Sequence, residues 1–297
     1  MECSACYESV GREHHFREMM VGTRKEFAYW ECRACGCLQI MSVPEDLSGY
    51  YPSNYYTFSR HATPWKRWYY RAYFTFPRLM KTLRRCSPEF SSLIACKFKP
   101  GTRILDVGCG GGELVGILRL LGFEAIGIDR YSEVGTPFVQ HVSFDEVHGD
   151  WDTIMFHHSL EHMMNHAEVL RCARRKLRAG GLCLVRIPLA TWAWEHYGRN
   201  WVQLDAPRHF IIHTPKSFKL TAAAAGFRIE QILFDSNEFQ FYGSELYQRD
   251  VPLLGGGGKS AFSRKELRRF RAQAEDLNRR QAGDQAAFFL RATADRN

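Results

Sequence analysis

Short apolar runs separated by amphipathic stretches dominate residues 101–188. Such runs, bounded by turn signals, are typical of buried strands, and residues 114–118 between the first two runs have helical spacing. Strands that alternate with helices predict an α/β fold with a doubly wound, mostly parallel sheet. The predicted strands cover residues 102–107, 125–128, 151–156 and 182–188.

The pattern continues after residue 188 with a further helix and strand. Thr214 is the expected N-cap of a helix that has Pro215 in its first turn and ends at Gly226. Alternating apolar and polar residues then predict a strand over residues 227–232.

Four glycines at residues 255–258 are followed by Lys and Ser. They predict a flexible link and not a phosphate-binding loop, because Leu253 stands where that loop needs its first glycine. Beyond the link, Ser263-x-x-Glu266 has the form of a capping box, which predicts the start of a basic helix.

Four of the ten cysteines form two pairs, Cys3-x2-Cys6 and Cys32-x2-Cys35. Each pair can place two thiolates on one ion, and two pairs complete the tetrahedral site of a structural zinc ion. Cys37 is an alternative to Cys35. The chain begins without the features of a signal peptide and has no run of about 18 apolar residues, so a cytoplasmic location with reduced thiols is expected. We therefore predict an N-terminal zinc ribbon.

A glycine-rich turn, Gly108-Cys109-Gly110-Gly111-Gly112, follows the first predicted strand. Glycine lets the backbone pass close to a ligand, and a helix N-terminus offers free N–H groups to an anionic group. Asp129 ends the next strand, where a carboxylate can bind ribose hydroxyls. Asp106, just before the turn, suits a cationic ligand better than a pyrophosphate, and the glycine spacing departs from G-x-G-x-x-G.

The segment Leu105-Asp106-Val107-Gly108-Cys109-Gly110-Gly111-Gly112 resembles the first motif of the class I S-adenosylmethionine (SAM)-dependent methyltransferases. Leu160-Glu161-His162, just beyond the strand over 151–156, resembles a later motif of that family. The resemblance implies a Rossmann-like fold in which the glycine turn holds the amino-acid part of SAM and Asp129 holds its ribose. The cofactor-binding residues that it implies are Asp106, Gly108, Cys109, Gly110, Gly112, Asp129, Arg130, His157 and His158.

One feature departs from the family pattern. Only 21 residues separate Asp129 from Trp151. A third strand, around residues 139–144, and its connections must fit there, so the helix that usually precedes this strand is expected to be absent or reduced.

Methyl transfer from SAM is an in-line displacement in which the enzyme mainly orients the acceptor. A hydroxyl acceptor also needs a general base, for which histidine is suited near neutral pH. We expect this base to be His209, with His162 the second candidate, in a loop over the open end of the sheet. Arg208 is expected to bind a carboxylate or phosphate. The predicted catalytic residues are His209, His162 and Glu161, and the predicted substrate-binding residues are Arg208, His213 and Tyr242.

The formal net charge of +8 belongs to one segment. Residues 51–88 contain eight Lys or Arg, no acidic residue and eleven aromatic residues, and residues 65–76 within them are expected to be helical. Three interpretations stay open: a linker helix packed on the catalytic domain, a platform that stacks on sugars or bases, and a membrane-surface helix.

The whole chain resembles one branch of the methyltransferases, with a zinc ribbon, a Tyr-Tyr-Pro-x-Asn-Tyr-Tyr stretch at residues 50–56 and a Pro-Arg-His loop at residues 207–209. Relatives are associated with bacterial surface polysaccharides, which implies O-methylation of a sugar hydroxyl in a cell-surface glycan or its precursor. The predicted domains are a zinc ribbon over 1–45, a basic aromatic linker over 46–95, a SAM-binding domain over 96–252, and a glycine linker with a basic helix over 253–297.

Three alternatives to sugar O-methylation remain open. One is C-methylation of a nucleotide-linked keto sugar, and another is methylation of RNA held by the ribbon and the basic segment. The third is a non-catalytic scaffold that binds SAM and zinc. The expected partner is a small-molecule or glycan acceptor, free, phosphorylated or nucleotide-linked, with nucleic acid and peripheral membrane contact through residues 51–88 as alternatives.

Overall fold

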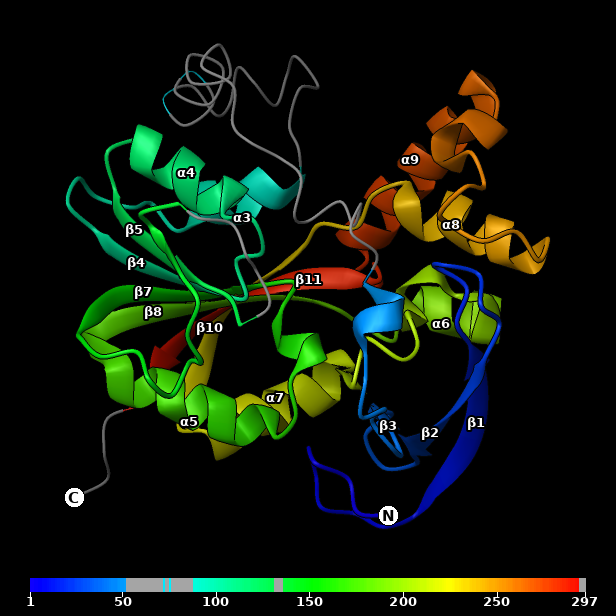
Figure 1. The fold of residues 1–297 in the computed structure, drawn as a ribbon, viewed down its shortest axis with the longest axis horizontal. Coiled ribbons are helices and arrows are strands. Elements are labelled where there is room, and N and C mark those ends of the chain that lie inside the picture. Colours follow the sequence, from blue (N-terminus) through cyan, green and yellow to red (C-terminus); the bar gives the residue numbers. More distant parts are fainter. Residues whose placement is uncertain (52–71, 73–74, 76–87, 131–135, 294–297) are drawn as a thin grey trace.

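The computed structural model describes residues 1–51, 72, 75, 88–130 and 136–293. Within them, the larger sheet has seven strands in the order β10-β11-β8-β7-β4-β5-β6 (Figure 1). Six of the strands run in one direction, and β11 runs antiparallel to both of its neighbours. The strands are β4 (Arg103–Val107), β5 (Glu124–Ile128), β6 (Val139–Gln140), β7 (Trp151–His157), β8 (Leu177–Pro188), β10 (Phe227–Phe234) and β11 (Gln285–Ala292).

Helices cover both faces of this sheet, which is why its central strands are almost continuously apolar. Four of the five β4 residues are buried, and the last eight residues of β8 are buried. Over one face lie α3 (Pro88–Ala95) and α4 (Glu113–Leu120), and over the other lie α5 (His166–Lys176) and α7 (Pro215–Ala224) (Figure 1).

The sequence-based expectation of a mostly parallel α/β sheet is confirmed. α7 begins as predicted, because Thr214 Oγ1 accepts a hydrogen bond from the Ser217 N–H at 3.1 Å, and Gly226 follows it with φ +79°. The third strand is shorter than expected, since β6 has two residues. The described residues between β5 and β6 contain no helix.

The C-terminal region was predicted incompletely. The capping box at Ser263 does start α9 (Arg264–Arg279). After it, however, β11 enters the sheet between β8 and β10, and its first six residues are buried. A catalytic-domain boundary at residue 252 therefore leaves out an interior strand of the sheet. The apolar run at residues 286–290 was the sequence signal for this strand.

A second sheet joins the N-terminal region to the catalytic region. It has the order β1-β2-β3-β9, with β1 (Gly11–Arg17), β2 (Glu26–Cys32) and β3 (Leu38–Ile40) from the N-terminal region. β9 (Ile211–Ile212) comes from the loop that carries His209. One hydrophobic cluster spans both parts: it includes Phe16 and Tyr29 together with residues of α6 (Trp192–Tyr197) and α8 (Phe239–Gln248).

The predicted helix over residues 65–76 and the interpretations of residues 51–88 fall almost entirely outside the described residues. Among the residues that are described, no helix combines the length and the apolar character needed to cross a membrane.

Candidate active site

The glycine turn joins β4 to α4 and leaves no space for a side chain at two positions. Gly108 and Gly112 have φ values of +73° and +75°, which favour glycine. A Cβ atom would lie 2.4 Å from Ser159 Cβ at Gly108, and 2.4 Å from Val139 Cγ2 at Gly112. The turn is therefore packed closely against the chain beyond β7 and against β6.

Two carboxylates flank this turn. Asp129 ends β5, and its Oδ2 accepts a hydrogen bond from the Gly110 N–H at 2.9 Å. Asp106 is buried; its burial, and then the charge of Asp129, raise the pKa of Asp106 to about 8. No hydrogen bond from the described residues reaches Asp106 Oδ1. A buried carboxylate with an unused oxygen, beside a second carboxylate, suits a cationic group. The residues present therefore fit the sulfonium-bearing amino-acid part of SAM.

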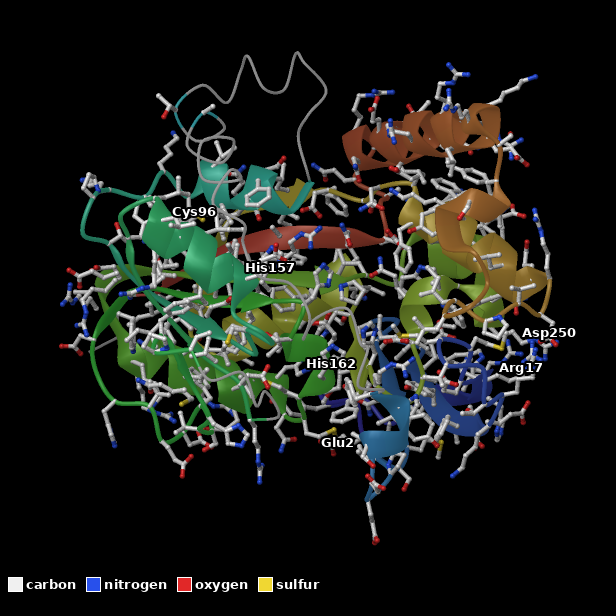
Figure 2. The ribbon with its side chains drawn as sticks, turned by 45° about the horizontal axis from the view of Figure 1, so that its top comes forward. Glu2, Arg17, Cys96, His157, His162 and Asp250 are labelled. Carbon is white, nitrogen blue, oxygen red and sulfur yellow. The ribbon has the colours of Figure 1, made fainter. Side chains whose placement is uncertain are left out.

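A cavity of about 2660 Å³ opens at the carboxyl ends of β4, β5, β7 and β8. Ligands of open α/β sheets bind at this edge. Sites for one ligand measure roughly 300–1,000 Å³, so this cavity has room for a cofactor together with an acceptor. His157 and His162 lie in it, in the middle of the molecule (Figure 2). The predicted site residues that line it are Asp106, Gly108, Cys109, Gly110, Asp129, Arg130, His157, His158, Glu161, His162, His209 and Tyr242.

Glu161, His162 and His209 form a cluster on one wall of this cavity. One carboxylate oxygen of Glu161 and one ring nitrogen of each histidine all lie within 4.8 Å of one another. His162 Nδ1 lies 2.8 Å from the Arg208 carbonyl oxygen, and His209 Nδ1 lies 2.9 Å from the Gln203 carbonyl oxygen. Because a carbonyl oxygen only accepts, both Nδ1 atoms carry a proton, and in a neutral ring this leaves Nε2 as the acceptor.

The charge state of His209 follows from its surroundings. Burial lowers the pKa of His209 to about 4, against the opposing effect of Asp205, whose Oδ2 lies 3.7 Å from His209 Nε2. The ring is therefore neutral at pH 7. These side chains are also of the types that bind divalent cations, but a neutral imidazole beside a carboxylate is sufficient to explain the arrangement as a proton acceptor.

A chain of polar side chains extends from this cluster across the cavity wall. Glu161 Oε1 lies 3.1 Å from His158 Nδ1, and the Arg186 guanidinium contacts His158 Nε2. Arg186 Nε donates to Asp235 Oδ2 at 2.6 Å, and both of these side chains are buried. Burial, and then the charges of Arg186 and His162, lower the pKa of His158. Arg186 and Asp235 were not among the residues predicted from the sequence. The signal for Arg186 was a charged residue within the apolar run of β8.

Two residues predicted to bind substrate have other partners. Arg208 is fully buried and donates hydrogen bonds to Asp205, to Glu18 Oε1 at 3.2 Å and to the Tyr50 carbonyl oxygen at 2.8 Å. His213 is also buried; its Nε2 lies 2.9 Å from His166 Nδ1. The polar atoms of Arg208 and His213 thus have partners inside the protein, and neither residue lines the cavity, so nothing in this structure supports their predicted contact with the acceptor. Gly112 likewise lies outside the cavity lining, where it caps α4.

The four predicted zinc ligands do converge. Their Sγ atoms all lie within 4.8 Å of one another, with 3.5 Å between Cys3 and Cys35 and 3.5 Å between Cys6 and Cys32. Zinc–sulfur bonds of about 2.3 Å in a tetrahedron place sulfurs about 3.8 Å apart, so this spacing fits one ion. Cys37 is buried beside this group: its thiol interacts with that of Cys3, and its Sγ lies 3.9 Å from His213 Nδ1.

A doubly wound sheet, a glycine turn between two carboxylates and a histidine cluster in one cavity define a SAM-dependent methyltransferase of class I. Comparison with known families agrees: the family described as "Methyltransferase domain" matches residues 66–232, more than half of the chain. The chain belongs to this family.

Curated relatives match a shorter region. The chain is 34% identical over 98 residues to the ubiquinone biosynthesis O-methyltransferase of Paracidovorax citrulli, which covers 27% of this chain and 41% of that protein. It is 32% identical over 100 residues to the human mitochondrial ubiquinone biosynthesis O-methyltransferase, covering 27% of each chain. The chain thus matches less than half the length of these relatives.

Solved structures with a similar fold include a SAM-dependent methyltransferase from Archaeoglobus fulgidus, with a TM-score of 0.45 and 22% identity over 72% of this chain and 99% of that one. Another is the cyclopropane synthase MmaA2 from Mycobacterium tuberculosis, with a TM-score of 0.41 and 16% identity over 65% and 79%.

Proposed function

We propose that this methyltransferase transfers the SAM methyl group to a hydroxyl of a small acceptor, with His209 as the general base. The observation that carries this proposal is the cluster of Glu161, His162 and His209 in the same cavity as the glycine turn. A neutral His209 Nε2 can accept the hydroxyl proton as the oxygen attacks the methyl carbon. The Asp205 carboxylate, 3.7 Å away, stabilises the resulting imidazolium.

The remaining residues of the site orient the two reactants. SAM supplies a methyl group on a sulfonium, which is already a good leaving group. We propose that Asp106 faces this positive charge, that the Gly108–Gly110 backbone holds the amino-acid part, and that Asp129 holds the ribose hydroxyls. His162, hydrogen-bonded through Nδ1 to the loop carbonyl, is the second candidate for the base.

For the acceptor we propose a sugar hydroxyl, in a glycan precursor or a nucleotide-linked sugar. Charged and polar side chains line the cavity beyond the histidine cluster, among them Arg186, Asp235 and Glu238. Such a wall suits a polyhydroxylated molecule, whose groups each need a hydrogen-bonding partner. The matched relatives are ubiquinone biosynthesis O-methyltransferases, so a phenolic hydroxyl is the competing acceptor. C-methylation of a keto sugar would use the same base on a C–H next to a carbonyl.

Methyl-labelled SAM incubated with the enzyme and a panel of acceptors tests this choice. The panel contains nucleotide-linked sugars, a polyprenyl catechol, total RNA and fractionated cell extract. The expected result is label in the sugar fraction that survives treatment with base. A methyl ether is stable under these conditions, whereas a methyl ester would lose its label. Label only in the catechol overturns the sugar assignment, and label in no fraction overturns the proposed activity. Retention of RNA that falls steeply with rising salt would instead favour a nucleic-acid substrate.

We also propose that residues 1–45 form a zinc ribbon in which Cys3, Cys6, Cys32 and Cys35 bind one structural ion. Four thiolates close the coordination sphere, so this ion has no open position for catalysis. The purified protein is expected to contain one zinc per chain and to lose thermal stability in chelator. Substoichiometric metal together with an unchanged melting temperature in chelator would contradict the ribbon.

A further inference from the structure

The loop that carries His209 is built into the N-terminal unit, defined here as residues 1–50. Directly after the histidine, β9 pairs with β3 of that unit and not with the larger sheet. The Ile40 N–H donates to the Phe210 carbonyl oxygen at 2.8 Å, and the Phe210 N–H donates to the Glu161 carbonyl oxygen at 2.7 Å. The backbone on this side of His209 is therefore held between the N-terminal sheet and Glu161 of the Glu161–His162–His209 cluster.

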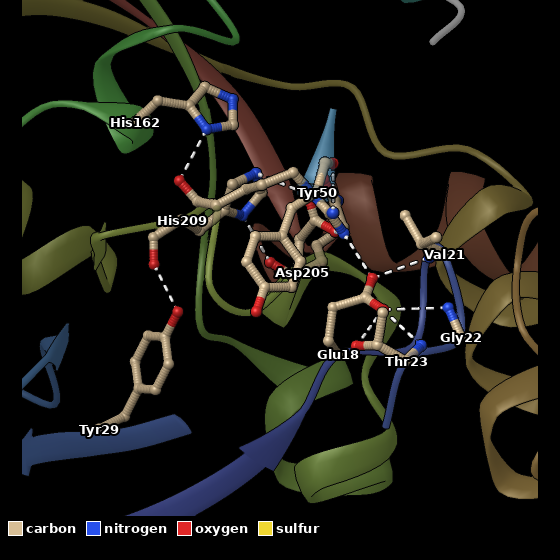
Figure 3. Close-up of polar contacts among 11 residues, drawn as sticks. Glu18, Val21, Gly22, Thr23, Tyr29, Tyr50, His162, Asp205 and His209 are labelled. Carbon is tan, nitrogen blue, oxygen red and sulfur yellow. Dashed lines mark hydrogen bonds and ion pairs between the residues drawn. The ribbon is translucent and has the colours of Figure 1, made fainter. Parts of the chain in front are cut away.

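The backbone of His209 itself receives a hydrogen bond from the N-terminal unit. The Tyr29 hydroxyl, on β2, donates to the His209 carbonyl oxygen at 2.8 Å (Figure 3). Tyr29 is fully buried, with its ring centroid 5.0 Å from that of Phe16. Its surroundings raise the pKa of Tyr29 well above the usual value, chiefly through burial, so the hydroxyl stays a donor at any working pH.

On the other side of His209, Arg208 connects the same two parts of the molecule. Its buried guanidinium is shared between Asp205, in its own loop, and Glu18 of the N-terminal unit. Glu18 is fixed in turn, because its carboxylate accepts hydrogen bonds from the backbone N–H groups of residues 21, 22 and 23. Meanwhile the Arg208 carbonyl oxygen accepts the Nδ1–H of His162. Arg208 therefore holds the catalytic loop to a rigid turn of the N-terminal unit.

We infer that the N-terminal unit is a functional part of the active site, and that Tyr29 and Arg208 are positioning residues for His209. This inference rests on the proposed role of His209 as the base. A ribbon that served only to recruit a partner would not need buried hydrogen bonds on both sides of that histidine. The geometric demand is high, because a displacement of about 1 Å in a catalytic group can cost on the order of 100-fold in rate.

Tyr29→Phe is the least disruptive test, since it removes one hydroxyl and keeps the ring in the core. We expect kcat to fall by about ten-fold, with the dissociation constant for SAM within about two-fold of the parent value. Methyl transfer from labelled SAM into fractionated cell extract gives the rate, and calorimetry gives the SAM affinity. The matched control is Tyr7→Phe, because Tyr7 is an exposed tyrosine of the same unit, and it should leave both quantities unchanged.

A double-mutant cycle separates positioning from general stability. In a His209→Gln background, adding Tyr29→Phe should lower the residual rate by less than about two-fold, because the residue that Tyr29 positions is already gone. If Tyr29→Phe lowers the rate by the same factor in the parent and in the His209→Gln background, the inference is overturned, since a merely structural tyrosine would affect both backgrounds alike.

Arg208→Lys provides a second variant, which keeps the charge but cannot make all three contacts of the guanidinium. It too should lower kcat while SAM binding persists. If His209→Gln loses turnover but Tyr29→Phe and Arg208→Lys do not, the inference fails and the proposed base stands. If His209→Gln keeps normal turnover, the proposed function fails as well, so the two failures are distinct.

Discussion

At the residue scale, the Asp205–His209 loop holds residues with different surroundings next to each other. Arg208 and His209 are neighbours in the chain, yet Arg208 is bonded inside the protein and His209 faces the cavity. The charge of Arg208 therefore stabilises the loop, and the imidazole of His209 next to it stays neutral at pH 7 because burial lowers its pKa.

His209→Ala should lower turnover by about 100-fold or more, because the hydroxyl proton loses its acceptor. The affinity for SAM should be unchanged, since the glycine turn is untouched. In the parent enzyme, turnover should fall as the pH drops through about 4, where the His209 imidazole becomes protonated and can no longer accept. A variant with near-normal turnover would remove His209 from the mechanism; labelled methyl transfer and SAM calorimetry measure both quantities.

Asp106 should make SAM binding dependent on pH. Its pKa is raised to about 8 in the protein alone, so at pH 7 it must lose a proton to face a cation. Affinity should therefore rise with pH up to about 8, by as much as about ten-fold per unit, and then level off. Calorimetry from pH 6 to pH 9 measures this rise. Asp106→Asn is the control: it should bind weakly with a flat profile, and a variant with the parent profile would assign the dependence to another group.

At the element scale, the turn between β4 and α4 shows why a motif of glycines is needed. The φ values of Gly108 and Gly112 lie in the left-handed region, and neighbouring side chains fill the space where Cβ atoms would stand. The element therefore depends on packing against β6 and on the chain after β7, as well as on its own conformation.

Gly112→Ala should lower the free energy of unfolding by about 1–3 kcal/mol and weaken SAM binding, because the new Cβ collides with Val139 and displaces the turn. Gly122→Ala is a matched control. Gly122 also has a left-handed φ, +93°, but no atom lies within 4 Å of its Cβ position. The control should show the conformational cost alone, with SAM affinity retained. Equal SAM affinities in the two variants would contradict a role for close packing.

At the scale of the whole molecule, two distant parts of the chain complete structures formed elsewhere. β11, close to the C-terminus, lies inside the catalytic sheet, and β9 of the catalytic region completes the N-terminal sheet. The unit that holds the four cysteines and the unit that holds the glycine turn are thereby joined into one structure around the cavity.

Phe288→Ala tests the position of β11. Phe288 is fully buried, with its ring centroid 4.2 Å from that of Phe218 on α7. Its truncation should lower the free energy of unfolding by about 3–5 kcal/mol in denaturant titration. Leu120→Ala, at a partly exposed apolar site on α4, should cost far less. A small effect at Phe288 would mean that the C-terminal segment does not belong to the sheet.

The sequence by itself determined the features that depend on local pattern. Apolar runs and glycine spacing predicted the parallel sheet, the turn before α4 and the acid at the end of β5, because each of these follows from neighbouring residues. The spacing of the cysteine pairs likewise indicated a common site for Cys3, Cys6, Cys32 and Cys35.

Only the tertiary structure decided which distant groups meet. The residues next to Arg208 in the sequence do not distinguish it from an arginine that faces a substrate. Its partner Glu18 lies near the N-terminus, far away in the sequence. The insertion of β11, the pairing of β9 with β3 and the line from Asp235 through Arg186 to Glu161 depend on non-local contacts. Hydrogen bonding and burial set the partners and the pKa of each group. Both depend on how the folded chain packs, which the order of neighbouring residues does not show.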